Sequence, residues 1–185
     1  MRCNAFAWNG TGESSLSVLE QSVTLEEMLA ARDIRAARQS ALLARFHCTL
    51  LCLTLNIPGP VKTPEGVETA FALALERIEH ALKDMDAAVL HRESYTEKTG
   101  YEAFYAIQTD AEALKKQMVQ IEDADNLGRL LDLDVLTAEG DKLSRPTPRT
   151  CLLCSRQAQL CARSRTHTVE ELCRKVRSIL LEISS

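Results

Sequence analysis

The segment Gly128-Arg129-Leu130-Leu131-Asp132-Leu133-Asp134-Val135-Leu136 carries the clearest pattern in this chain. Apolar and acidic residues alternate through its second half, and a period of two is typical of a β-strand with one buried face. The sequence therefore predicts a strand over 131–137 whose leucines and valine enter a hydrophobic core. Asp132 and Asp134 then point together from the opposite face, about 7 Å apart along the strand.

Two carboxylates at this spacing favour a divalent cation. Mg²⁺ prefers oxygen ligands, keeps several waters and completes its shell with substrate phosphates. When bound, such an ion stabilises the charge that develops as pyrophosphate leaves a polyphosphate. Asp132 and Asp134 are the predicted metal ligands, and Glu122, at the end of a predicted strand over 118–122, is a third catalytic carboxylate if that strand pairs with this one. The open alternative is an edge strand whose outer face is simply polar.

Two further places suit phosphate groups. Gly128 permits a tight turn and the close approach of a phosphate, with Arg129 as a charge partner. At residues 56–64, a rigid turn rich in proline leads into a predicted helix N-terminus beside Lys62, where free backbone N–H groups and the helix dipole favour an anion. A stiff connector with an exposed lysine explains the same residues.

Capping signals and apolar runs outline the rest of the fold. Helix starts are predicted at Thr24, Thr63-Pro64, Thr109 and Thr168, and the first two helices are expected to end near residues 46 and 85. Strands are predicted over 48–57, 87–92, 101–108, 118–122 and 131–137, with a short return strand near Leu143. Because helices and strands mingle without strict alternation, we expect an α+β fold with a mixed or antiparallel sheet flanked by helices.

The composition is that of one folded domain. The 185 residues are 45 % apolar and 26 % charged, and a chain of this size buries about 70 % of its unfolded surface without metals or disulfides. Residues 1–22 indicate a flexible leader and residues 23–185 a single domain. The longest apolar stretch, 48–61, is broken by prolines and falls short of the roughly 20 residues of a membrane helix. Without the apolar run of a signal peptide, we expect a cytoplasmic protein with no membrane partner.

The net charge of −4 is unevenly distributed. Residues 110–141 hold nine acidic and three basic side chains, whereas residues 142–177 hold nine basic and two acidic ones. One interpretation is that two solvent-exposed surfaces differ in charge without any functional reason. The functional interpretation is a metal-attracting acidic cluster beside a basic patch for phosphates or for an acidic protein partner.

Seven cysteines in a reducing cytosol indicate buried thiols or metal ligands before disulfides. Cys151, Cys154, Cys161 and His167 follow the spacing C-x2-C-x6-C-x5-H, which suits a closed tetrahedral zinc site of a structural kind. The alternative is a helix in which the three cysteines and Ala158 share one face as a stripe of small packing residues.

The chain has no nucleophile elbow, Walker loop or glycine-rich dinucleotide motif. A transferase that splits a polyphosphate needs no covalent nucleophile when the acceptor hydroxyl belongs to another molecule. Five motifs, in order over about residues 22–183, are similar to those of the holo-citrate lyase synthase family, also called apo-citrate lyase phosphoribosyl-dephospho-CoA transferase. They are Ala31-Arg32-Asp33-x-Arg35-x-Ala37-Arg38-Gln39, Pro58-Gly59-Pro60-Val61-Lys62, Leu127-Gly128-Arg129-Leu130-x-Asp132-x-Asp134-Val135-Leu136-Thr137, Gly140-Asp141-x-Leu143-Ser144-Arg145, and Cys151-Leu152-Leu153-Cys154 continued by Cys161-Ala162-Arg163 and His167.

This resemblance implies a nucleotidyltransferase-like fold and a nucleotidyltransferase-type reaction. By this resemblance, the phosphoribosyl-dephospho-CoA group is expected to pass from triphosphoribosyl-dephospho-CoA to a serine of the citrate lyase acyl carrier subunit, with release of pyrophosphate. Asp132 and Asp134 become the Mg²⁺ ligands of a transferase domain, and the basic residues over 142–177 would meet an acidic carrier protein. The side chains expected to contact phosphates are Lys62, Arg129 and Arg145. Arg32 is expected either to bind the substrate or to stabilise the fold.

Two other classes of function stay open. One is a non-enzymatic, zinc-stabilised module that binds nucleic acid through its basic C-terminal third. The net negative charge and an aromatic content of 4 % argue against it, so no nucleic-acid partner is expected. The other is a carrier-protein chaperone without chemistry, which would release no pyrophosphate.

Overall fold

The computed structural model describes residues 22–184, so the predicted leader over 1–22 lies outside the described residues apart from Ser22. The elements are α1 (Leu25–Phe46), β1 (Thr49–Leu55), α2 (Val67–Asp84), β2 (Ala88–Glu97), β3 (Gly100–Gln108), α3 (Ala111–Asp123), the 3-10 turn η1 (Gly128–Leu130), β4 (Leu131–Leu136), α4 (Ala158–Arg163) and α5 (Val169–Ile183). The predicted α+β class is confirmed.

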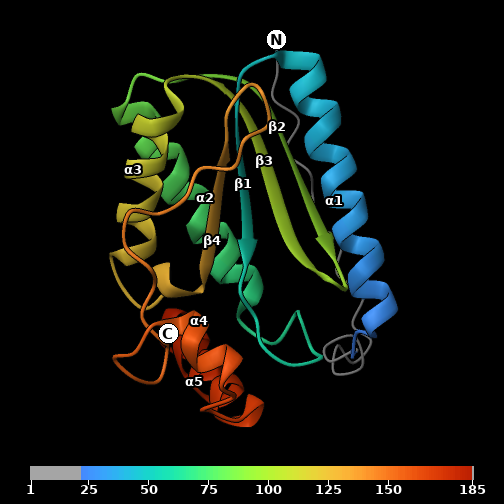
Figure 1. Ribbon diagram of the computed structural model, residues 1–185, viewed down its shortest axis with the longest axis vertical. Coiled ribbons are helices and arrows are strands. Elements are labelled where there is room, and N and C mark those ends of the chain that lie inside the picture. The colour runs from blue at the N-terminus through green and yellow to red at the C-terminus, as the bar shows by residue number, and fades with distance from the viewer. Residues whose placement is uncertain (1–21, 185) are drawn as a thin grey trace, which may run out of the picture.

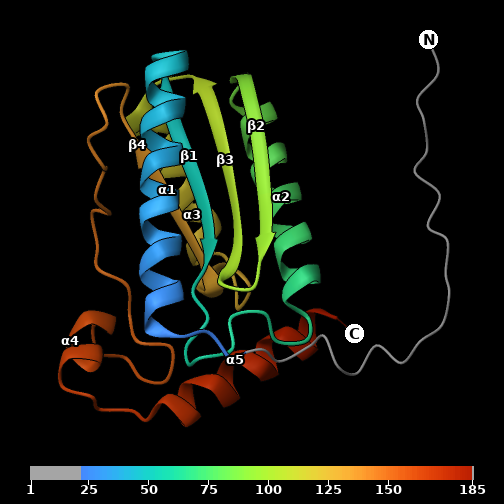
Figure 2. The same cartoon turned by 90° about the vertical axis from the view of Figure 1, so that its right-hand side faces the viewer.

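A four-stranded antiparallel sheet forms the centre, in the order β2-β3-β1-β4. Helix α1 covers one face, and α2 and α3 cover the other (Figures 1 and 2). The larger core lies between the sheet and α2, α3 and α5, and a smaller core under α1 is built around Leu50, Cys52 and Phe104. Strand β4 is an edge of the sheet, which leaves one row of its backbone groups to be satisfied by other elements.

Two helices begin where their capping boxes predict, after Thr24 and Thr168. Helix α2 instead begins three residues beyond Pro64, because residues 64–66 form a turn in which the Val67 N–H donates to the Pro64 carbonyl at 3.1 Å. Helix α3 is capped by Asp110 rather than by Thr109, since the Asp110 carboxylate accepts the Ala113 N–H at 2.7 Å.

The strand predicted over 118–122 is wrong, because these residues belong to α3. Leu114, Met118 and Ile121 are buried together at spacings of four and three, which is the period of a helix that turns one face to the core. The return strand predicted near Leu143 is a single bridge between Leu136 and Lys142.

No helix within residues 22–184 is long and apolar enough to cross a membrane. The longest, α1, has 22 residues but carries charged side chains along its length, including Arg32, Asp33 and Arg35.

Candidate active site

Asp132 and Asp134 lie on the same face of β4, as the alternation predicts. The apolar residues between and beside them are fully buried against α2 and α3. In contrast, the side chain of Asp132 is 50 % exposed and that of Asp134 is 24 % exposed. In the sheet register Asp132 pairs with Thr54 and Asp134 with Cys52, which belongs to the core beneath α1. The two carboxylates therefore open on the α1 side of the sheet edge.

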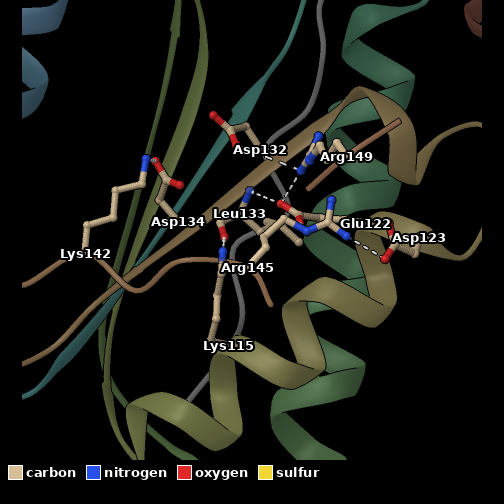
Figure 3. A network of polar contacts seen from close by, with 9 residues as sticks. All are labelled: Lys115, Glu122, Asp123, Asp132, Leu133, Asp134, Lys142, Arg145 and Arg149. Atoms are coloured by element: carbon tan, nitrogen blue, oxygen red, sulfur yellow. Dashed lines mark hydrogen bonds and ion pairs between the residues drawn. The ribbon is translucent and has the colours of Figure 1, made fainter. Parts of the chain in front are cut away.

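Two cations stand beside this pair (Figure 3). The Lys142 Nζ lies 2.5 Å from Asp134 Oδ2, and the Arg149 Nη2 lies 3.9 Å from Asp132 Oδ1. The Lys142 side chain is 60 % exposed, and an ion pair of that kind contributes about 0–1 kcal/mol to stability. A divalent ion can therefore displace Lys142 from Asp134 at little cost.

The donor set fits Mg²⁺. Both groups are carboxylates, which supply the hard oxygen ligands that this ion prefers, and their partial exposure leaves coordination positions for water and for substrate phosphates. Asp132 and Asp134 are thus the side chains that could hold the ion.

Glu122 reaches β4 from α3 rather than from a neighbouring strand (Figure 3). Its side chain is 1 % exposed, and Oε1 accepts the Leu133 N–H at 2.7 Å. The buried Lys115 donates from Nζ to the Leu133 carbonyl at 2.8 Å. Together they satisfy the outward-facing backbone groups of an edge strand. The strand pairing that would have made Glu122 a third metal ligand does not exist, and its contacts instead hold the strand that carries the two aspartates.

Arg145 and Arg149 complete this network. Arg149 is ion-paired with Glu122, while Arg145 lies 2.5 Å from Asp123 through Nη2 and 3.6 Å from Glu122 through Nε. Burial raises the pKa of Glu122 because desolvation outweighs the attraction of the two arginines. The Nη1 of Arg145 is buried without a hydrogen-bond partner, so this predicted phosphate contact keeps an unused donor.

Arg149 is a site residue that sequence reasoning missed. It was one of nine basic residues in a charged run, and the spacing in that run did not separate it from the others. Its position depends on how the loop after β4 returns to the strand, which is a tertiary contact.

Gly128 has a packing role at the start of β4. A Cβ at this position would clash with the Ile121 carbonyl oxygen and lie 2.8 Å from that of Glu122, so only glycine lets η1 approach the end of α3 this closely. Arg129 donates from Nη2 to the Thr150 carbonyl at 2.7 Å and so ties η1 to the cysteine-containing loop, residues 150–157. The proposed phosphate contacts of Gly128 and Arg129 stay predictions.

Lys62 lies in the turn after β1, and Arg32 lies on α1. The Lys62 Nζ donates to the Ile57 carbonyl at 2.7 Å within its own turn, and burial lowers the pKa of this lysine. Arg32 is exposed on α1. The contacts shown for these residues do not bring them to the aspartate pair, and their phosphate-binding roles stay predictions.

Glu102 is a second residue that the sequence did not single out. Glu102 is buried on β3 and lies opposite Thr54 of the neighbouring strand. Its Oε1 accepts a hydrogen bond from the Nε of Arg35, a residue of α1, at 2.8 Å. Arg38 adds an ion pair at 3.6 Å. The only sequence signal for Glu102 is that an acidic residue interrupts an apolar strand. The contacts of Glu102 with Arg35 and Arg38 attach α1 to the face of the sheet that carries Asp132.

The cysteines and histidine of the C-terminal part come together. The ligand atoms of Cys151, Cys154, Cys161 and His167 all lie within 4.8 Å of one another, with 3.5 Å between the Cys154 and Cys161 sulfurs and 3.4 Å from His167 Nε2 to Cys154 Sγ. Sulfur ligands of a tetrahedral zinc ion, at about 2.3 Å from the metal, are about 3.8 Å apart. The four side chains thus form a possible metal-binding cluster.

The packing-stripe alternative is excluded by the backbone. Residues 152–156 form bends between Thr150 and Gln157, which are joined by a bridge, and α4 begins only at Ala158. The hydrogen bond with His167 lowers the pKa of Cys154 to about 6, which favours the thiolate form that binds metals. Burial raises the pKa of Cys161.

Comparison with known proteins identifies the family. Residues 23–183 match the family model described as apo-citrate lyase phosphoribosyl-dephospho-CoA transferase. A probable apo-citrate lyase phosphoribosyl-dephospho-CoA transferase of Vibrio cholerae serotype O1 is 37 % identical over 168 residues, which cover 88 % of this chain and 94 % of the relative. A protein of the same description from Streptococcus pyogenes serotype M5 is 38 % identical over 160 residues, 82 % of each chain.

A third relative is longer. The protein CitXG of Haemophilus influenzae is 35 % identical over 170 residues, which cover 90 % of this chain but 37 % of that relative. The family is one of transferases, so the non-enzymatic alternatives are set aside and the chain is an enzyme. By both the family match and the identity to these relatives, the chain belongs to the apo-citrate lyase phosphoribosyl-dephospho-CoA transferase family.

Proposed function

We propose that this enzyme transfers phosphoribosyl-dephospho-CoA from triphosphoribosyl-dephospho-CoA to a serine of the citrate lyase acyl carrier subunit, with release of pyrophosphate. The observation that carries the proposal is the pair Asp132 and Asp134 on one face of an edge strand, beside Arg149. An acidic pair next to guanidinium groups suits a metal-bound polyphosphate, and the family name supplies the identity of the transferred group.

In this reaction the serine Oγ attacks the phosphorus joined to the ribosyl oxygen, the bond from that phosphorus to the bridging oxygen breaks, and the serine proton is released. Asp132 and Asp134 hold Mg²⁺, which supplies charge neutralisation on the phosphate oxygens when it is bound. Arg145 and Arg149 donate to phosphate oxygens, since both already reach the region of Glu122 and Arg145 keeps an unused N–H. Glu122 positions β4 and contacts no substrate in this proposal.

The test is a transfer assay with purified components and Mg²⁺. Asp134→Asn is expected to lower kcat/KM at least about a hundredfold, because a metal ligand that acts on the developing charge is lost. The measurements are the mass increase of the apo-carrier subunit and the pyrophosphate released. Asp84→Asn, an exposed change at the end of α2, is the matched control. Normal turnover by Asp134→Asn, in a folded protein, would overturn the proposal.

We also propose that Cys151, Cys154, Cys161 and His167 bind a structural zinc ion. Four protein ligands leave no open position for a substrate, so the ion would hold together the loop after residue 149, α4 and the start of α5 rather than take part in the reaction.

The basic residues over 142–177 are the proposed contact for the carrier subunit. Exposed Arg163 lies on α4 and exposed Arg174 on α5, so the positive charge belongs to the part of the molecule that also carries the cysteine cluster. An acidic partner would be steered toward this end of the enzyme.

A further inference from the structure

A large cavity lies between the end of the sheet and the C-terminal part of the chain. Its volume is about 790 Å³, and its walls come from the loop after β1, from η1, from the cysteine-containing loop, and from α4 and α5. Figure 1 shows these elements gathered at one end of the molecule, where β1 ends and β4 begins. The cavity is thus formed where the sheet meets the cysteine-containing region.

The lining combines two chemistries. Apolar residues from the loop and from α5 form one part, including Leu152, Val169 and Leu172. The arginines Arg129, Arg149 and Arg165 also belong to the lining. The apolar walls suit an uncharged part of a ligand, and three arginines in one lining suit an anionic group, although Arg129 and Arg149 also contact protein atoms. The complementary ligand has an uncharged body and a phosphate group.

The cavity reaches Arg149, which contacts the acidic pair. Leu130 lines it and lies two residues before Asp132 on the chain, a separation of about 7 Å in an extended strand. Arg149 also lines it and reaches to within 3.9 Å of Asp132. A ligand whose polyphosphate lies at the aspartates can therefore extend past Arg149 into the cavity.

We propose that this cavity binds the dephospho-CoA part of the donor. Dephospho-CoA has an adenosine and a pantetheine arm joined by a diphosphate, which matches apolar walls interrupted by arginines. The adenine ring or the pantetheine arm packs against Leu152 and Leu172, and the diphosphate is held by the guanidinium groups. This assignment rests on the proposed function, because the donor is identified by the transfer reaction, and it adds the place where the non-reacting part of the donor is recognised.

Cys151, Cys161 and His167 belong to the same lining, so the cysteine cluster forms part of the cavity wall. The proposed zinc ion would therefore shape the donor pocket at a distance from the reacting phosphorus.

The experiment measures the binding of dephospho-CoA itself by isothermal titration calorimetry, with the full chain reconstituted with zinc. Dephospho-CoA lacks the triphosphate, so its binding reports on the cavity and not on transfer. Leu172→Trp fills the cavity and is expected to weaken binding at least tenfold and to raise the donor KM in the transfer assay. Leu181→Trp, on the same helix but 61 % exposed, is the matched control and should bind as the wild type does.

Arg165→Glu is the second variant, because its exposed side chain can be changed without disturbing a core. It is expected to weaken dephospho-CoA binding at least threefold, with a steeper loss at low salt. No binding of dephospho-CoA to the wild type, or wild-type binding by Arg165→Glu and by folded Leu172→Trp, would overturn the assignment.

The two proposals fail separately. Asp134→Asn should still bind dephospho-CoA while it loses transfer. If Asp134→Asn transfers normally, the proposed function fails whatever the cavity binds, and if the cavity variants bind normally while transfer still depends on Asp134, the cavity assignment alone fails.

Discussion

Glu122 shows how a single buried carboxylate can place an active site without belonging to it. Its Oε1 accepts a backbone N–H of the strand that carries the aspartates, and its charge is shared between Arg145 and Arg149. The same arginines are the proposed phosphate contacts. A change at Glu122 should therefore act first on stability and, through the strand and the arginines, on donor binding.

We predict that Glu122→Ala lowers the free energy of unfolding by about 2–4 kcal/mol, because a buried N–H loses its acceptor and two partly buried arginines lose an ion-pair partner. Glu122→Gln keeps an acceptor for the Leu133 N–H and should lose less. Urea unfolding followed by circular dichroism measures both. Equal stability of the wild type and Glu122→Ala would show that this contact does not hold the strand.

The same residue predicts a pH dependence. Burial raises the pKa of Glu122 in the folded state above its ordinary value of 4.5. The folded protein then holds this proton more tightly than the unfolded chain, so the contribution to stability is fully present below pH 4.5 and is lost as the pH rises through the folded pKa. The difference in unfolding free energy between the wild type and Glu122→Gln should fall over that range, and a difference that grows with pH would contradict the argument.

At the scale of elements, local patterns predicted strongly periodic segments better than short ones. The alternation over residues 131–136 and the capping box at Thr24 needed no tertiary information, and both are confirmed. The apolar run over 118–122 was too short to separate a strand from a helix. Its helical period becomes clear only when Leu114, one turn earlier, is included.

The residues of the candidate site also fall into those that local sequence patterns predict and those that depend on tertiary contacts. Asp132 and Asp134 were predictable because strand geometry alone puts them on one face, whereas the function of Glu122 and the presence of Arg149 depend on how α3 and the later loop return to β4. The spacing of the cysteines left two alternatives open. The loop closed by Thr150 and Gln157 decides between them, and spacing does not encode it.

We predict that the full chain binds zinc at one ion per molecule and that Cys154→Ser loses most of it, since three ligands hold zinc less tightly than four. Hydrogen exchange should become faster in residues 149–168 of this variant. Metal content is measured after zinc reconstitution, with Cys48→Ser as the control because Cys48 lies outside the cluster. Equal zinc in Cys154→Ser and the wild type, or none in either, would rule the site out.

At the scale of the whole molecule, the acidic and basic parts of the chain meet at one edge of the sheet. The acidic pair projects from β4, and the basic C-terminal part continues from it through the loop that supplies Arg145 and Arg149. Positive charge near the aspartates suits both a polyphosphate donor and an acidic carrier protein, which have to arrive together for transfer.

We predict that the KM for the apo-carrier subunit rises with ionic strength, because exposed charges are screened over a Debye length of about 10 Å at 0.1 M salt. Arg163→Glu and Arg174→Glu should each raise this KM about threefold or more at low salt and flatten the salt dependence. Lys83→Glu, an exposed charge reversal on α2, is the control. A carrier KM that is insensitive to salt and to both reversals would place the carrier contact elsewhere.

The central claim is that Asp132 and Asp134 together hold the divalent ion. Electron paramagnetic resonance titration with Mn²⁺, a paramagnetic substitute for Mg²⁺, measures this directly in the presence of dephospho-CoA and inorganic triphosphate. We predict that Asp132→Asn and Asp134→Asn each weaken Mn²⁺ binding at least about tenfold relative to the wild type and to Asp84→Asn, without loss of folded structure. Mn²⁺ binding by both variants with wild-type affinity would contradict the account.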